Sequence, residues 1–223
     1  MKITARVLLV SVLVLGVSAT SQAALISIGG GMIYDEDLNL TWLSDGLASA
    51  GSAFDDGSLP NDGRMTWESA NAWAADLSVG GITDWRLPTA LNSDGSICTG
   101  YNCTDSEMGH LFYQELSGTP GLTIVNSGDP DLALFTNIDT GFWLETAYIK
   151  NLSYAFFFGS VNAGIQTYGG RGSNLNVLAV YEGDARTVLG GGGGGVSVPE
   201  PASLALMSLG LAGLGFSRKK KIL

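Results

Sequence analysis

The chain has 223 residues, of which 21 are acidic and 11 are basic. The basic residues gather at the two ends, so residues 24–198 carry five basic against 20 acidic side chains, a net charge of −15. A body this acidic repels phosphate groups, which excludes nucleic acids and anionic membrane surfaces as its partners. The length suits one domain with appended segments, and the 45% of hydrophobic residues can supply a core.

The first 23 residues have the pattern of a secretory signal peptide. Lys2 and Arg6 precede an apolar stretch over residues 7–17, and small side chains follow. This arrangement predicts cleavage by signal peptidase between Ala23 and Ala24. The apolar stretch is shorter than the roughly 20 residues that span a bilayer, which argues against a permanent anchor here.

The pattern of residues 24–186 predicts one α+β domain with two helices. Thr66 can cap a first helix that presents Trp67, Trp73 and Leu77 on one face. The capping-box pattern Thr104-Asp105-Ser106-Glu107 opens a second helix, which is expected to end at Gly118.

Short stretches rich in β-branched and aromatic residues, separated by Gly, Asn and Asp, predict strands. In chain order they cover residues 25–28, 32–34, 40–43, 122–125, 142–148, 153–158, 165–168 and 177–181. Residues 160–164 are typical of a hairpin turn between the sixth and seventh of these.

Five motifs follow one another in this body: Leu40-Thr41-Trp42, Met65–Ala70, Gly81–Pro88, Ser106–Phe112 and Phe142–Thr146. Together they resemble the Lcl C-terminal domain family over most of residues 32–184. The resemblance implies a single compact C-type-lectin-like domain of two helices and short antiparallel strands, with an adhesive role toward polysaccharides in some relatives. It assigns structural roles to Trp42, Trp67, Asp84, Trp85, Arg86, Leu87, Pro88 and Trp143.

The Asp84–Pro88 motif has a simple structural interpretation. Trp85 and Leu87 are two residues apart, so they share one face of an extended segment and are expected in the core. Arg86 then points to the other side, toward an ion-pair partner or loop carbonyl groups. We expect the rings of Trp67, Trp73 and Trp85 to be buried together.

The two cysteines, Cys98 and Cys103, enclose four residues. In an exported protein such a pair predicts a disulfide. The alternative is a redox-active or copper-binding pair of thiols, as in formylglycine-generating enzymes of related fold.

His110 is the only histidine, and the sequence indicates no partners for acid–base or zinc chemistry, so we expect a structural role and no catalytic residue. Asp35, Asp37, Asp55 and Asp56 lie in turn-like acidic segments whose oxygen atoms could suit Ca²⁺. Neither segment has a complete calcium-loop spacing. We therefore interpret both as solvated acidic loops and expect no obligatory cofactor.

The C-terminal segment has three parts: Pro199-Glu200-Pro201, an apolar run over residues 202–217, and the basic cluster Arg218-Lys219-Lys220-Lys221. A glycine-rich tether, residues 187–198, precedes it. The three parts resemble the PEP-CTERM sorting signal of Gram-negative bacteria that produce exopolysaccharide. The resemblance implies that an exosortase, a membrane-embedded protease-transpeptidase, processes residues 199–221 after a transient stage in the inner membrane. A permanent anchor is the alternative, although sixteen residues rise only about 24 Å as a helix.

These patterns favour an exported, non-enzymatic protein of the cell surface or exopolysaccharide matrix, with a structural or adhesive role. Its partners would be signal peptidase and exosortase during processing, and glycans afterwards. Exposed rings such as Tyr101, Tyr148 or Tyr168 could stack on sugars. The alternative function is a formylglycine-generating or other secreted enzyme on the same fold.

Overall fold

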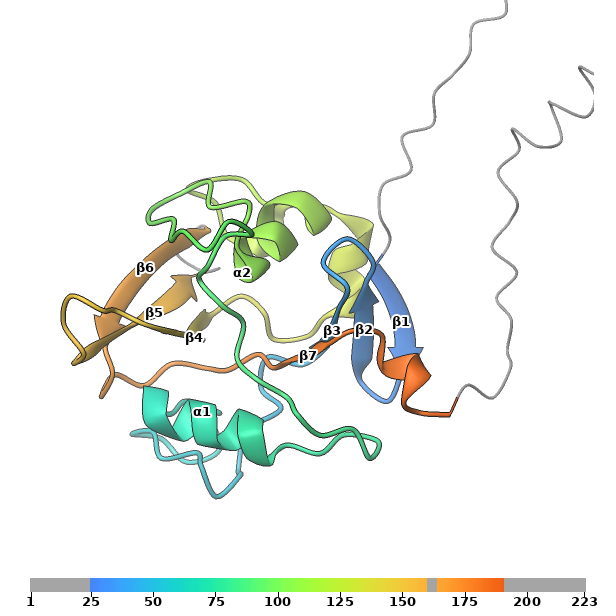
Figure 1. The fold of residues 1–223 in the computed structure, drawn as a ribbon, viewed down its shortest axis with the longest axis horizontal. Coiled ribbons are helices and arrows are strands. Elements are labelled where there is room, and N and C mark those ends of the chain that lie inside the picture. The colour runs from blue at the N-terminus through green and yellow to red at the C-terminus, as the bar shows by residue number, and fades with distance from the viewer. Residues whose placement is uncertain (1–24, 160–163, 191–223) are drawn as a thin grey trace, which may run out of the picture. The chain divides into compact units, whose positions relative to one another are not determined.

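The computed structural model describes residues 25–159 and 164–190 (Figure 1). The signal peptide, most of the predicted hairpin turn and the sorting signal lie outside the described residues. No helix within the described ranges is long and apolar enough to cross a membrane. The unit that holds both sheets ends at Ala185.

The fold is α+β, as predicted, with two antiparallel sheets and two short α-helices. The first sheet has the order β1-β2-β3-β7, and its strands are β1 (Leu25–Gly29), β2 (Met32–Asp35), β3 (Leu40–Leu43) and β7 (Val180–Glu182). The second has the order β4-β5-β6, and its strands are β4 (Gly141–Ala147), β5 (Tyr154–Gly159) and β6 (Ile165–Gly170). The helical elements are α1 (Trp67–Asp76), α2 (Glu107–His110), the π-helix η1 (Leu111–Glu115) and the 3₁₀ turns η2 (Ile124–Asn126), η3 (Pro130–Leu134) and η4 (Ala185–Thr187).

One extended segment, residues 176–182, joins the two sheets. At its start Asn176 forms backbone hydrogen bonds with β4, and at its end Val180 pairs with Trp42 of β3. Val177, Leu178 and Ala179 between them are fully buried. The predicted strand over residues 177–181 therefore begins too early, because only residues 180–182 have a continuous neighbouring strand.

The first predicted helix is confirmed. The hydroxyl of Thr66 accepts a hydrogen bond from the backbone N–H of Ser69, and Trp73 lies in the core. The expectation that the three rings are buried together is wrong for Trp67, which is only half-buried. Its ring lies beneath Arg171, whose guanidinium carbon is 4.1 Å from the ring centroid.

The second predicted helix begins two residues later than its capping-box pattern indicated. Ser106, not Thr104, is the N-cap residue. Glu107 does not complete a capping box, because its carboxylate binds Arg86 instead. After one α-helical turn the chain widens into η1, where Leu116 N–H bonds to the carbonyl of Leu111 five residues earlier.

The predicted strand over residues 122–125 is wrong. This stretch ends in the 3₁₀ turn η2, and only Ile124 is buried, whereas Leu122 and Val125 are more than half exposed. A strand needs a neighbouring backbone, and no strand pairs with this stretch within the described ranges. Of its apolar side chains, only that of Ile124 anchors the stretch in the core.

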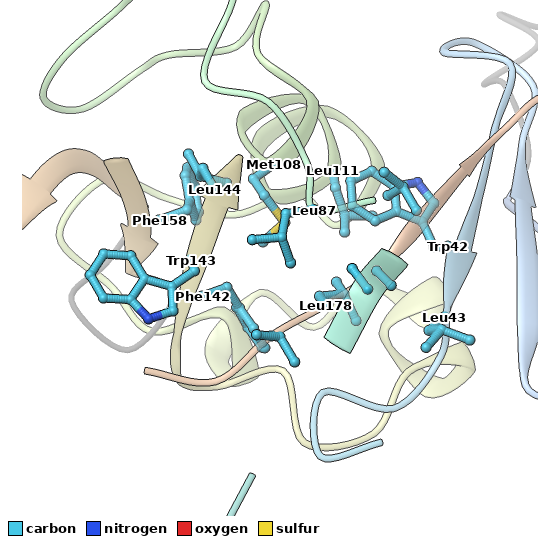
Figure 2. Close-up of a cluster of buried hydrophobic side chains, with 14 of the residues drawn as sticks. Trp42, Leu43, Leu87, Met108, Leu111, Phe142, Trp143, Leu144, Phe158 and Leu178 are labelled. Atoms are coloured by element: carbon cyan, nitrogen blue, oxygen red, sulfur yellow. The ribbon is translucent and has the colours of Figure 1, made fainter. Parts of the chain in front are cut away.

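The core lies between the two sheets, with α2 and η1 also packed into it (Figures 1 and 2). Trp42 enters it from β3, Trp143 and Phe158 from the second sheet, and Met108 from α2. All four side chains are at most 4% exposed. Aromatic rings from both sheets therefore meet the helical segment at one centre, so the sheets cannot separate without exposing it.

We predict that Trp85→Ala destabilises the domain strongly. Trp85 is 3% exposed, its ring packs 6.0 Å from that of Tyr181, and its indole N–H donates to the carbonyl of Ile82. Removing the ring leaves a large cavity and should cost about 3–5 kcal/mol of unfolding free energy. Denaturant titration measures the loss. Ile149→Ala, at an 80% exposed position, is the control, and equal stability of the two variants would contradict the packing role.

Candidate functional site

Arg86 is the centre of a group of ion pairs and hydrogen bonds that joins three segments of the domain. Its two terminal nitrogens bind both carboxylate oxygens of Glu107, at 2.8 and 2.7 Å, and one of them also contacts Glu182 at 2.9 Å. The backbone of Arg86 forms two hydrogen bonds with Val180. Glu107 in turn accepts the backbone N–H of Thr89. The motif arginine therefore joins its own loop to α2 and β7.

The electrostatics of this pair follow from burial and proximity. Burial alone would lower the pKa of Arg86, but the hydrogen bonds and charge of Glu107, and then those of Glu182, raise the pKa well above its ordinary value. The guanidinium thus stays charged, with its fork geometry matched to the carboxylate. The ion pairs hold the surrounding segments in position, and they occupy the guanidinium group of Arg86.

The other motif residues lie in the framework as well. Trp42 and Trp143 are completely buried, and Leu87 and Pro88 are also buried, whereas Asp84 is exposed at a positive φ of 64°. An Asp tolerates this left-handed conformation better than most residues, and the turn directs Trp85 inward.

Cys98 and Cys103 form a disulfide with a Cα–Cα distance of 5.5 Å. Neither sulfur is therefore a free thiol in this oxidised state. Gly100 within the loop exchanges two backbone hydrogen bonds with Gln166 of β6, whose buried side-chain amide also donates to the carbonyl of Cys98. The disulfide loop is thus fixed to the second sheet, next to the start of α2.

The two acidic segments are not brought together. In the second one, the Asp55 carboxylate accepts the backbone N–H groups of Gly51 and Gly63. The Asp56 carboxylate accepts hydrogen bonds from the backbone N–H of Thr66 and from the hydroxyl of Ser69. Its slight burial would raise the pKa of Asp56, but these hydrogen bonds outweigh it and lower the pKa. Both side chains therefore shape the loop before α1.

In the first acidic segment, Asp35 is completely buried and Asp37 is exposed. The Asp35 carboxylate accepts the backbone N–H of Leu38 and the indole N–H of Trp42. His110 is also buried, and its Nε2 lies 3.0 Å from Oε1 of Glu115. Burial, and then the charge of Asp35, raises the pKa of Glu115 above its ordinary value. The expectation of a solvated acidic loop is therefore wrong for Asp35, because the β2–β3 turn folds its side chain inward.

A group of aromatic rings lies at the end of the second sheet, and we name it the aromatic face: Tyr148, Tyr154, Phe156 and Tyr168. Tyr148 and Tyr168 are stacked with centroids 4.0 Å apart and planes at 9°. Tyr154 and Phe156 meet Tyr168 edge-on, at 6.0 and 5.9 Å. Tyr154 and Tyr168 are 38% and 40% exposed, whereas Phe156 is buried beneath them.

The sequence interpretation named Tyr148 and Tyr168 but missed their neighbours. Tyr154 and Phe156 alternate along β5, and the register places Phe156 opposite Tyr168. The sequence shows that Tyr154 and Phe156 are two residues apart on one predicted strand, but it does not show that Tyr168 lies opposite Phe156. Tyr101, the third ring named, is 49% exposed on the disulfide loop, and it is not among the rings in contact within the aromatic face.

Comparison with known proteins identifies one segment of the chain. Residues 197–219 match the PEP-CTERM protein-sorting motif. No curated protein and no solved structure matches the chain. The motif supports the interpretation of the chain as an exosortase substrate, which is processed in a membrane-associated step and sorted to the cell surface or matrix.

We predict that Glu107→Ala costs about 3 kcal/mol of unfolding free energy, because Arg86 would be left partly buried without its main partner. Glu182→Ala removes a contact from the same guanidinium. Since the Glu182 side chain is 72% exposed, that variant should lose at most about 1 kcal/mol. Paired denaturant titrations of the two variants measure this difference. Equal losses would show that the bidentate pair does not stabilise the fold more than a surface contact.

Proposed function

We propose that this protein is a non-enzymatic adhesive or structural component of the cell surface or exopolysaccharide matrix, and that its C-type-lectin-like domain binds polysaccharide through the aromatic face. The sorting motif supports the destination. The aromatic face supports the activity, and the stacked pair Tyr148–Tyr168 is the observation on which the proposal depends.

Sugar rings present apolar C–H faces and hydroxyl edges. A tyrosine ring that is fixed by its neighbours offers a flat apolar surface with a polar tip, and it binds with little loss of conformational entropy. Tyr148 holds Tyr168 in this way, and Tyr154 extends the surface at a right angle. Ile149 and Leu152, in the adjoining β4–β5 loop, are 80% and 66% exposed and add apolar area.

The net negative charge of the chain limits which glycans the domain can bind. Residues 24–198 carry a net charge of −15, so a uronate-rich or sulfated polymer would be repelled. Hydrogen bonding to Tyr148, and then the charge of that side chain, raises the pKa of Tyr168, so its hydroxyl stays neutral over the physiological range. The net charge of the domain and the neutral hydroxyl of Tyr168 therefore favour uncharged polysaccharides, although the positive charge of Lys150 also acts on Tyr168.

We predict that Tyr168→Ala weakens binding of the mature protein to an uncharged polysaccharide by about tenfold or more. Glycan-array screening with uncharged and uronate polymers, followed by titration calorimetry on the best uncharged hit, measures the effect. Tyr101→Ala is the matched control, because Tyr101 is at least as exposed but lies outside the aromatic face. Equal losses in the two variants, or binding to uronate polymers alone, would contradict the proposal.

We also predict cleavage of the sorting signal near Pro199-Glu200-Pro201. Intact-mass measurement of surface or matrix material should then show that residues beyond about 201 are missing. Changing the three residues to alanine, or deleting the exosortase, should leave the full-length tail and keep the protein in the membrane fraction. Mature material that still carries Lys219–Lys221 would identify a permanent anchor instead.

A further inference from the structure

The sequence contains one histidine, and the fold surrounds it with carboxylates. Asp35, His110 and Glu115 each direct a ligand-type atom to one place, where the three atoms lie within 4.8 Å of one another. All three residues are buried. A fourth group, Oδ2 of Asp37, lies 3.9 Å from Nε2 of His110.

A π-helix makes this arrangement possible. His110 and Glu115 are five residues apart, and in a regular α-helix their side chains would diverge by about 140°. The wider turn of η1 bonds residue i to i+5 and thus brings the two side chains to one side. As a result, Nε2 and Oε1 meet at 3.0 Å.

The cluster is short of positive charge. It holds the three carboxylates of Asp35, Asp37 and Glu115 and a single imidazole, and within the described residues only His110 forms an ion pair with Asp37 or Glu115. The Glu115 side chain is 4% exposed, and within the same residues the contact between its Oε1 and His110 is the ion pair of its carboxylate. Buried carboxylates without compensating charge are costly, whereas a bound cation would satisfy them.

We propose that Asp35, His110 and Glu115 bind a divalent first-row transition-metal ion such as Zn²⁺, and that the exposed Asp37, whose Oδ2 lies 3.9 Å from Nε2 of His110, turns toward the ion as the fourth ligand. One imidazole nitrogen with carboxylate oxygens is a donor set that these ions accept, whereas Ca²⁺ prefers six to eight oxygen ligands. In a tetrahedral site, ligands about 2.1 Å from the ion lie about 3.4 Å apart, so the three atoms, which now lie within 4.8 Å of one another, would draw together by up to about 1.4 Å.

The surroundings of Asp35 resemble the outer shell of a metal site. The backbone N–H of Leu38 and the indole N–H of Trp42 each occupy one carboxylate oxygen, at 3.0 and 3.1 Å, and fix its orientation. With four protein ligands no position stays open for substrate. The ion would therefore be structural, and it would clamp the β2–β3 hairpin to α2 and η1.

The test uses the purified mature protein, stripped with EDTA and then titrated separately with Zn²⁺, Mn²⁺ and Ca²⁺. We expect one Zn²⁺ per chain by elemental analysis and a rise in melting temperature. Glu115→Gln keeps the size of the side chain and an oxygen facing His110 but removes a charged ligand. This variant should weaken zinc binding by at least about tenfold. Glu36→Gln, between the two proposed aspartate ligands and exposed, is the matched control and should bind like the wild type.

If Glu115→Gln fails to fold, Asp37→Asn tests the same site from the exposed side and should also weaken binding. The proposal is overturned if the stripped protein takes up no Zn²⁺ or Mn²⁺, if Ca²⁺ alone binds, or if Glu36→Gln loses as much affinity as the ligand variants. None of these outcomes depends on glycan binding, so the metal site and the proposed function can fail independently.

Discussion

The bidentate ion pair between Arg86 and Glu107 joins three parts of the chain that are distant in sequence. It fixes the loop after α1 to the first turn of α2, while the same arginine contacts Glu182 at the end of β7. Charge-assisted hydrogen bonds are about twice as strong as neutral ones, and a planar fork also fixes direction. The pair therefore fixes the position of the loop after α1 relative to the first turn of α2. Because the Glu107 carboxylate binds Arg86, it does not complete the predicted capping box, and Ser106 is the N-cap residue of α2.

The second constraint is the buried segment from Asn176 to Val180. It bonds to β4 at one end and to β3 at the other, so the two small sheets share one backbone connection through the core. The apolar face of a sheet has to be buried against another element, and here each sheet is covered through this shared core. The large rings of Trp42, Trp143 and Phe158 fill the space that this connection spans (Figure 2).

With the framework fixed in this way, the acidic residues have different roles according to their depth. Asp55 and Asp56 replace missing backbone partners in a loop, which is a structural use of carboxylates near the surface. Asp35 and Glu115 are taken into the interior beside His110, where charge cannot be left uncompensated. The exposed aromatic face lies at the far end of the second sheet, so recognition of a glycan and binding of a metal would use separate parts of the domain.

The sequence by itself determined the features that depend on local pattern. The sorting motif, the first helix with its Thr66 cap, and most strands were predictable, because caps, alternation and targeting signals are properties of short stretches. The inward direction of Trp85 and Leu87 followed from the same alternation. Only the tertiary structure decided which side chains meet. Glu107 became the partner of Arg86, Phe156 was placed opposite Tyr168, and the π-turn brought Glu115 to His110 and Asp35. These contacts depend on register and chain crossing between distant segments, and no local pattern of residues encodes that information.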